Sequence, residues 1–464
     1  MIRRLWFGAG FAVALLFAAC GGDSTATIAP DTTTTTGSST TAATTTTAAS
    51  PTSGPTTSTA PKRLGTSAGV ATTAKTPDFA ALDGARTSFG VIDGASYAIE
   101  MPDKWNGELV LYAHGFAGFG TEVSVQTPPS SLRRYLISNG FAWGASSYSE
   151  NGYVPGIGAD DTLALKQKFI DEFGTPKKTY IVGASMGGNV VSLALENQAP
   201  AYDGGLALCG ALMGIGQIDY LASWVAAAEY TSGVHFPIGE PGANLAGVFL
   251  SDVPRELGAP ATPTQKGLQF ASIIKNLTGG PRPFFQEGFV EQYTVNFGLA
   301  LLDPERKFLV NKAATNADAV YHIDPGLGLT DAQIDSGITR YASDPASRNA
   351  EAHPDAVLTT GNISVPLLTL HGTGDLFVPI TMERDYAAAV AKAGKSDLLV
   401  QRAIRSGGHC KFSAEELTTA FEDLVTWVHD GTKPKGEDLS GDLMNAGLEF
   451  TNPLRPSDPG GTGQ

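Results

Sequence analysis

Cysteine and histidine are scarce in this chain, with three cysteines and seven histidines among 464 residues. No group of these residues has the close spacing that holds a zinc ion. The scarcity argues against a metal-dependent site, and we expect neither a metal nor a cofactor. It also limits the chain to one internal disulfide with one cysteine left over.

Positive charge is also low, since 31 lysines and arginines face 46 aspartates and glutamates, for a formal net charge of −15. Proteins that bind nucleic acid need a basic surface to neutralise phosphates, so this balance argues against such a partner. Hydrophobic residues make up 42% of the chain and charged residues 17%, so most of it can bury a core. Beyond residue 20, no run is long and apolar enough to span a membrane.

The first twenty residues have the pattern of an export signal. Arg3 and Arg4 give a positive start, and residues 5–19 are apolar but too short to span a bilayer comfortably. The segment ends in Leu-Phe-Ala-Ala-Cys, which resembles the lipobox of bacterial lipoproteins, in which the cysteine is acylated and becomes the mature N-terminus. We predict that Cys20 carries this lipid, on a protein anchored to the outer face of the cell membrane or secreted. The alternative is an ordinary cleaved signal peptide with a chance cysteine.

Composition divides the rest of the chain. Residues 21–76 are dominated by threonine and have few large apolar residues, so they should form a disordered tether that cannot offset its chain entropy by burial. Residues 77–213 and 362–435 have the composition of a folded core. Residues 214–361 contain helical patterns and few strand-like runs, and we predict a mostly helical cap or lid over an active site. Residues 436–464 form a C-terminal extension.

Strand and helix patterns alternate along the predicted core. Apolar runs of strand length are followed by segments with helical periodicity. Such alternation predicts an α/β fold with a mostly parallel central sheet flanked by helices on both faces. The expected strands cover residues 96–101, 108–113, 141–148, 179–184, 205–208, 365–370 and 398–404, and the expected helices cover residues 160–173, 189–197, 381–392 and 413–429.

The sharpest motif is Gly-Ala-Ser-Met-Gly at residues 183–187. It follows an expected strand and precedes an expected helix, as in a nucleophile elbow, where a serine sits on a strained turn and the glycines avoid clashes with neighbouring backbone. The same spacing occurs at residues 65–69 around Ser67, but no strand precedes that copy, and we interpret it as chance. Ser185 is therefore the predicted nucleophile, and the alternative is a structural glycine-rich turn.

A serine hydroxyl needs a base to take its proton and an acid to orient that base. Asp375 follows an expected strand within His-Gly-Thr-Gly-Asp-Leu-Phe-Val-Pro, and His409 lies in Ser-Gly-Gly-His-Cys between the last strand and the last helix. With Ser185 they resemble the α/β-hydrolase superfamily, in motif and in chain order, over about residues 95–431 apart from the insertion. The resemblance implies a catalytic triad of Ser185, Asp375 and His409 on an α/β-hydrolase fold.

The same resemblance implies an oxyanion hole made of two backbone N–H groups. One belongs to Met186, the residue after the nucleophile. The other comes from the loop after the early strand, where we choose Phe116 over Ala117. Such donors stabilise the negative charge that develops on the carbonyl oxygen during acyl transfer.

The other titratable residues are interpreted as structural. His114 and His371 each precede a glycine at a strand end, and we expect them to shape loops near the site. Asp219 could line the pocket, but it lies outside the loop that carries the acid in this family. The remaining histidines have no acid placed by motif, and these are His235, His322, His353 and His429.

Two cysteines remain after Cys20. Cys209 ends the strand after the nucleophile helix, and Cys410 follows the predicted catalytic histidine, so both should lie at the carboxyl edge of the parallel sheet. Export to an oxidising compartment favours a disulfide between them over two buried free thiols. We expect this bond to hold the His409 loop against the sheet.

Together these residues predict a serine esterase, which cleaves carboxylic esters through an acyl-enzyme intermediate. We expect a monomer that acts outside the cytoplasm on a small-molecule or polymeric ester. Two alternatives stay open: a secreted serine peptidase of the same fold, and a non-catalytic cell-surface binding protein. Ester and peptide substrates separate the two enzymes, and a Ser185→Ala control separates an enzyme from a binder.

Overall fold

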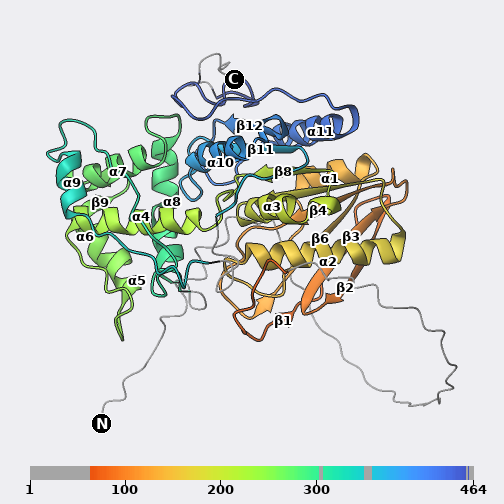
Figure 1. Ribbon diagram of the computed structural model, residues 1–464, viewed down its shortest axis with the longest axis horizontal. Coiled ribbons are helices and arrows are strands. Elements are labelled where there is room, and N and C mark those ends of the chain that lie inside the picture. Colours follow the sequence, from red (N-terminus) through yellow and green to blue (C-terminus); the bar gives the residue numbers. More distant parts are fainter. Residues whose placement is uncertain (1–62, 303–306, 350–357, 456–457, 459–464) are drawn as a thin grey trace, which may run out of the picture.

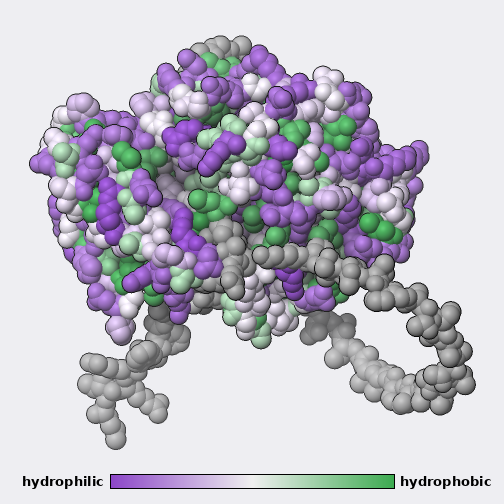
Figure 2. All heavy atoms as spheres, viewed as in Figure 1, coloured by the Kyte–Doolittle hydropathy of each residue, from purple (hydrophilic) through white to green (hydrophobic). Residues whose placement is uncertain are grey.

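The computed structural model describes residues 63–302, 307–349, 358–455 and 458. The predicted export signal with Cys20, most of the tether, and His353 lie outside these residues. Figure 1 shows the α/β core on one side of the molecule and the helices of the insertion on the other. Figure 2 shows hydrophilic side chains over most of the same view, with hydrophobic ones scattered among them. Within the described part of the chain, no helix is long and apolar enough to cross a membrane.

The core contains a large sheet, formed in the described residues by eight strands. These are β2 (Ala85–Ile92), β3 (Ala95–Pro102), β4 (Glu108–Ala113), β6 (Ala142–Ser146), β7 (Lys178–Ala184), β8 (Gly204–Leu208), β11 (Leu367–Gly372) and β12 (Leu399–Ile404). Their order across the sheet is β12-β11-β8-β7-β4-β6-β3-β2. All neighbours from β12 to β6 are parallel, and β3 is antiparallel to both β6 and β2. Every strand that the sequence predicts is present.

Helices cover both faces of this sheet. α2 (Pro155–Phe173), α3 (Met186–Asn197) and α10 (Thr381–Lys392) pack on one face, and α1 (Ser130–Ser138) and α11 (Ala414–Asp430) pack on the other. Their apolar sides join those of the strands in two large buried clusters. The predicted fold class, a mostly parallel sheet flanked by helices, is therefore confirmed. Two short helical turns, η2 (Ala199–Ala201) and η5 (Ser396–Leu398), complete the described core.

The predicted end of the tether at residue 76 is wrong, because residues 63–76 pack against the core. The N–H group of Leu64 donates to Asp160 Oδ2 over 2.8 Å. Farther along, β1 (Thr73–Ala74) pairs in parallel with β5 (Glu122–Val123). These contacts reach partners far along the chain, and local composition carries no information about them.

Helices are the main regular elements in the described part of the insertion, and long irregular segments connect some of them. Its elements are α4 (Gly216–Ser232), α5 (Leu245–Gly247), η3 (Val248–Asp252), α6 (Val253–Leu257), α7 (Gln265–Leu277), α8 (Phe285–Leu301), α9 (Asp331–Gly337) and a small hairpin of β9 (Gly258–Ala259) and β10 (Thr262–Pro263). Trp224 of α4 is fully buried against the rings of Phe270 and Phe289. These rings hold the helices of the insertion together, and they belong to the same buried cluster as the side chains on one face of the sheet.

The C-terminal extension lies along β12, the edge strand of the sheet. Glu437 N–H donates to Gln401 O over 2.7 Å, and Ala403 N–H donates to the Glu437 carboxylate over 3.0 Å. Leu439 and Leu443 pack in a small buried cluster with Ala403. The extension thus pairs backbone groups that an open sheet edge would leave exposed.

Candidate active site

Ser185 lies at the turn from β7 to α3, as its motif predicts. Its backbone φ is 60°, a value that residues with a side chain rarely adopt. A Cβ atom added at Gly183 would lie 2.1 Å from Gly187 O, and one added at Gly187 would lie 2.0 Å from Ala113 O. Both glycines are therefore required, since any side chain there would displace the backbone. The turn presents Ser185 to a cavity that the insertion also lines.

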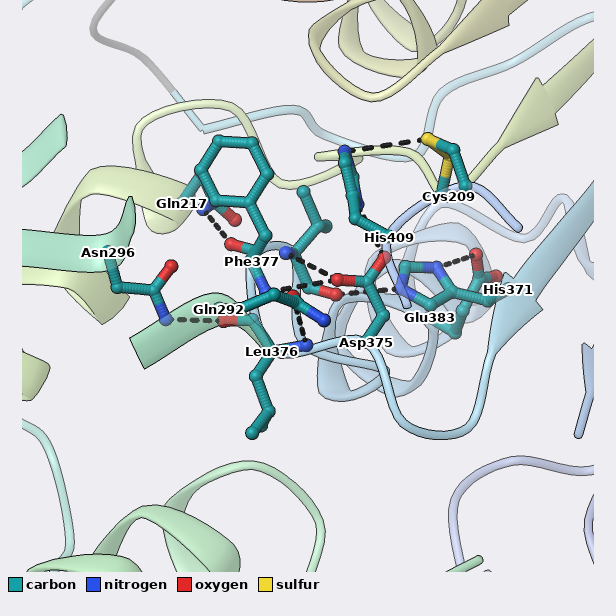
Figure 3. Close-up of polar contacts among 12 residues, drawn as sticks. Cys209, Gln217, Gln292, Asn296, His371, Asp375, Leu376, Phe377, Glu383 and His409 are labelled. Atoms are coloured by element: carbon teal, nitrogen blue, oxygen red, sulfur yellow. Dashed lines mark hydrogen bonds and ion pairs between the residues drawn. A yellow bond between two sulfur atoms is a disulfide. The ribbon is translucent and has the colours of Figure 1, made fainter. Parts of the chain in front are cut away.

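Asp375 and His409 form a hydrogen-bonded pair, shown in Figure 3. Asp375 lies in the loop after β11 and is fully buried. Its Oδ2 accepts a hydrogen bond from His409 Nδ1 over 2.6 Å, and its Oδ1 accepts from the N–H groups of Phe377 and Val378 over 3.0 and 3.1 Å. The carboxylate is held at both oxygens, so it fixes the imidazole with Nε2 as the atom that can take up a proton.

Ser185 and His409 share no hydrogen bond in the described structure. The Nε2 atom of His409 instead lies 3.4 Å from Cys410 Sγ. Catalytic hydrogen bonds are often long without substrate and shorten when substrate binds. The structure thus joins Asp375 to His409 and puts Ser185 at the same carboxyl edge of the sheet, and the catalytic roles of all three residues stay predictions.

Three parallel strands, β7, β11 and β12, each end just before one of these residues. Ser185 follows β7, Asp375 follows β11 and His409 follows β12, in that order along the chain. A serine on a strained strand-to-helix turn, followed by an acid and then a histidine, is the arrangement of one fold. The chain has the α/β-hydrolase fold. The resemblance seen in the sequence is thereby confirmed at the level of the fold.

Several known proteins are similar to the chain, although no family model matches it. A curated relative, an o-phthalyl amidase from Xanthobacter agilis, is 23% identical over 426 residues, which cover 78% of this chain and 90% of the relative. Feruloyl esterase B from Aspergillus oryzae is 15% identical, with a TM-score of 0.44 over 75% of this chain and 80% of the esterase. An acylaminoacyl peptidase from Pyrococcus horikoshii is 13% identical, with a TM-score of 0.38 over 76% of this chain and 43% of the peptidase. At these levels of similarity, none of them fixes a substrate.

The loop after β4 lies against the serine of this α/β-hydrolase fold. A Cβ atom added at Gly115 would lie 3.1 Å from Ser185 Cβ, and the next residue, Phe116, lines the same cavity as the serine. Met186 is the first residue of α3, and the first N–H groups of a helix have no partner within it. Both positions fit the predicted donors of an oxyanion hole, an assignment that stays a prediction.

His114 shapes this loop, as we expected. Its ring stacks on Tyr148 with centroids 3.9 Å apart, and Tyr148 Oη donates to His114 O over 3.0 Å. Burial lowers the pKa of His114, so the ring is neutral at pH 7. Its Nδ1 lies 2.7 Å from Gly115 O, where a neutral ring donates a hydrogen bond that holds the turn beside Ser185.

Amide side chains from the insertion hold the acid loop, as Figure 3 shows. Gln292 of α8 accepts with Oε1 from Leu376 N–H over 2.8 Å and from Phe377 N–H. Asn296 Nδ2 donates to Leu376 O over 2.8 Å, and Gln217 Nε2 of α4 donates to Phe377 O over 2.6 Å. Sequence reasoning missed all three amides, because single polar residues in an insertion form no motif. The insertion therefore holds the loop that carries Asp375 and also lines the cavity.

We predict that Gln292→Leu lowers kcat for ester substrates by about 10- to 100-fold with little change in KM, since small displacements of a catalytic group carry large kinetic costs. Leucine has nearly the same size but leaves two loop N–H groups without their acceptor. Gln286→Leu is the matched control, because Gln286 is an exposed glutamine on the same helix. Equal kcat values for the two variants would contradict a positioning role for Gln292.

His371 supports the acid loop from the sheet side. Its Nδ1 lies 3.1 Å from Glu383 Oε1, and its Nε2 lies 2.9 Å from Val378 O. Burial alone would lower the pKa of His371, but the Glu383 and Asp375 carboxylates and the Val378 carbonyl together outweigh it and raise the pKa above its usual value. A protonated ring donates to both acceptors, so His371 ties α10 to the loop of Asp375, in the structural role expected of it.

The other residues that we interpreted as structural are engaged elsewhere. Asp219 accepts hydrogen bonds from Arg348 and from Thr315 N–H, and it is absent from the described residues that line the cavity. Three histidines of the described chain face carboxylates of their own, namely His235 beside Glu229, His322 beside Asp331 and His429 beside Glu108.

Cys209 and Cys410 are joined by a disulfide in the structure, with Cα atoms 5.2 Å apart, which is the predicted pairing. Both residues have positive φ, at 47° and 56°. The bond links the end of β8 directly to the residue after His409. It is therefore placed to limit movement of the histidine loop, whose Nε2 atom lies beside it.

We predict that breaking this bond weakens both stability and turnover. The double variant Cys209→Ala/Cys410→Ala should unfold at lower temperature, with a loss of about 2–5 kcal/mol in unfolding free energy. Reductant should lower kcat of the wild type toward that of the double variant and leave the double variant unchanged. Two free thiols in protein purified from an oxidising compartment would contradict the pairing.

Proposed function

We propose that the protein is a serine hydrolase that cleaves carboxylic esters. Ser185 is the nucleophile, His409 the general base, and Asp375 the acid that orients the base. The observation that carries this proposal is the 2.6 Å hydrogen bond between Asp375 and His409 at the same sheet edge as a serine with φ of 60° on a strand-to-helix turn. A strained serine and a buried acid–base pair would be costly to maintain in a protein that only binds.

In the proposed reaction, His409 Nε2 takes the proton of Ser185 Oγ as that oxygen attacks the ester carbonyl. The N–H groups of Phe116 and Met186 stabilise the charge on the carbonyl oxygen. The protonated imidazole gives its proton to the departing alcohol, which leaves an acyl group on Ser185. Water, deprotonated by His409, then releases the acid and restores the serine. Asp375 stabilises the cationic ring in both steps.

An amidase is the second candidate, since the curated relative is an o-phthalyl amidase. The same residues would attack an amide, with the amine protonated by His409 as it leaves.

Ester cleavage is favoured over peptide cleavage because a peptide terminus needs a charged anchor. None of the described residues that line the cavity is charged.

A matched pair of chromogenic substrates tests the choice between ester and amide. We expect Ser185-dependent cleavage of the 4-nitrophenyl ester of butyric acid and no Ser185-dependent cleavage of the matching 4-nitroanilide, because the ester is intrinsically far more reactive and a modest preference for it would not separate the two functions. Ser185-dependent cleavage of the anilide would make the amidase the correct function. Cleavage of neither compound, with Ser185→Ala binding ligands as wild type does, would favour the non-catalytic binding protein.

We also propose that the enzyme acts outside the cytoplasm, held to the membrane by lipid on Cys20. The support is the sequence of the export signal alone, with its short apolar segment ending at Cys20. Wild type should partition into detergent and take up a fatty-acid probe, and Cys20→Ala should do neither. Equal labelling of the two proteins would refute the lipid anchor.

A further inference from the structure

We propose that the cavity beside Ser185 binds an uncharged aromatic acyl group that carries a hydrogen-bond donor, and that Gln217 Oε1 accepts from that donor. This inference rests on the proposed hydrolase function and specifies the substrate class of the same site. It follows from the chemistry of the cavity wall and from the fixed orientation of one amide.

The wall of the cavity is mainly aromatic and aliphatic. Phe116 and Phe119 contribute rings in edge-to-face contact 4.9 Å apart, and the insertion contributes Leu299 and Phe308. Ile218, Leu221 and Val378 add aliphatic surface to the same wall. A flat apolar group gains most from such surroundings, whereas an ionised group would lose its hydration without an ionic partner.

Gln217 contributes an amide to this wall, and the orientation of that amide is fixed. The residue is only 4% exposed, and its Nε2 donates to Phe377 O over 2.6 Å. If the Gln217 amide were reversed, its oxygen would face the carbonyl oxygen of Phe377, and two acceptors cannot form a hydrogen bond. The nitrogen therefore faces Phe377 O, and Oε1 is the amide atom that this bond leaves over. That oxygen is buried and has no hydrogen-bond partner in the described structure. A buried acceptor without a donor is costly, and a substrate that supplies the donor removes the cost.

Two other polar side chains lie in the wall. Tyr153 Oη lies 3.1 Å from both Asn189 Oδ1 and Gly214 O, which accept its hydrogen within the protein. Ser185 Oγ is the proposed nucleophile. Gln217 Oε1 differs from both, because it is a buried amide acceptor with no hydrogen-bond partner in the described structure, and the matching substrate group is a hydroxyl or an amide N–H on the ring.

A series of substrates that differ only in the donor tests this inference. The series is the 4-nitrophenyl ester of 3-phenylpropanoic acid together with its ring-hydroxylated isomers and an acetamido derivative. For wild type, we expect at least one donor-bearing ester to exceed the parent by about 10- to 100-fold in kcat/KM, the usual range for one buried neutral hydrogen bond. The hydroxyl and acetamido members distinguish an O–H donor from an N–H donor.

In Gln217→Met, the kcat/KM values of the donor-bearing ester and the parent ester should agree within about twofold, since methionine has similar length but no comparable acceptor. The ratio between substrates is the readout, because losing the Nε2 bond to Phe377 O would slow all esters alike. If Gln217→Met fails to fold, Gln217→Asn, one methylene shorter, replaces it with the same expected loss.

Two outcomes would overturn the inference and leave the esterase proposal standing. One is equal rates for parent and donor-bearing esters in wild type, and the other is an unchanged preference in the Gln217 variant. If no member of the series is hydrolysed in a Ser185-dependent way, both the inference and the proposed function fail.

Discussion

Ser185→Ala is expected to lower the turnover of ester substrates by about 10,000- to 1,000,000-fold, the range seen when a serine nucleophile is removed from a catalytic triad. The protein should remain folded, because alanine keeps the Cβ atom that already occupies this turn and loses no described side-chain hydrogen bond. Turnover is measured by release of 4-nitrophenol, and folding by the thermal unfolding temperature.

Ser67→Ala is the matched control for this experiment, since Ser67 lies in the second copy of the motif. Ser67 is exposed in the segment 63–76, where its Oγ donates to Glu150 Oε1 and no strand-to-helix turn surrounds it. Ser67→Ala should keep near wild-type turnover. Full activity in Ser185→Ala, or its loss in Ser67→Ala, would show that the nucleophile is misassigned.

Asp375→Asn should lower kcat by about 10,000-fold with the fold intact, because an asparagine amide facing His409 Nδ1 stabilises the wrong tautomer of the ring. The Asn Oδ1 atom can still accept from Phe377 N–H and Val378 N–H, so the loop keeps its shape. His409→Ala should cost a similar factor. The double variant Ser185→Ala/His409→Ala should lose little beyond the worse single variant, since the triad acts as a unit.

Asp219→Asn is the control for the acid, because Asp219 is a half-buried carboxylate that we also considered as a residue of the pocket. It forms an ion pair with Arg348 in the insertion. Breaking that pair should lower the unfolding temperature and leave the pH dependence of kcat unchanged. If Asp375→Asn were active and Asp219→Asn inactive, the acid would have to be reassigned.

The central sheet was predictable from the sequence because its buried strands are short apolar runs with clear ends. β2 was missed because most of its residues are only partly buried, so its alternation is weak. α2 begins at Pro155, before the predicted start at residue 160, in a glycine-rich stretch with poor helix propensity. Packing explains this start, since a Cβ atom at Gly158 would lie 2.8 Å from Val190 Cγ2. Tertiary contact there overrides local preference.

The candidate site also contains residues that the sequence predicts and residues that it does not. Ser185, Asp375 and His409 were predictable because each stands in a motif at a strand end, and the disulfide followed from the same placement. The amides of Gln217 and Gln292 were not, because their roles depend on how the insertion folds back onto the acid loop. No periodicity or spacing in the sequence encodes that contact over such a separation.

The most direct test of the proposed chemistry is to ask which atom reacts with a serine-directed fluorophosphonate. An activated serine displaces fluoride and keeps the phosphonyl group, and peptide mass spectrometry locates the adduct. We predict a single adduct on Ser185, no adduct after Ser185→Ala, and much slower labelling in His409→Ala and Asp375→Asn. An unlabelled wild-type protein, or an adduct on another serine such as Ser67, would contradict the assignment of Ser185 as nucleophile.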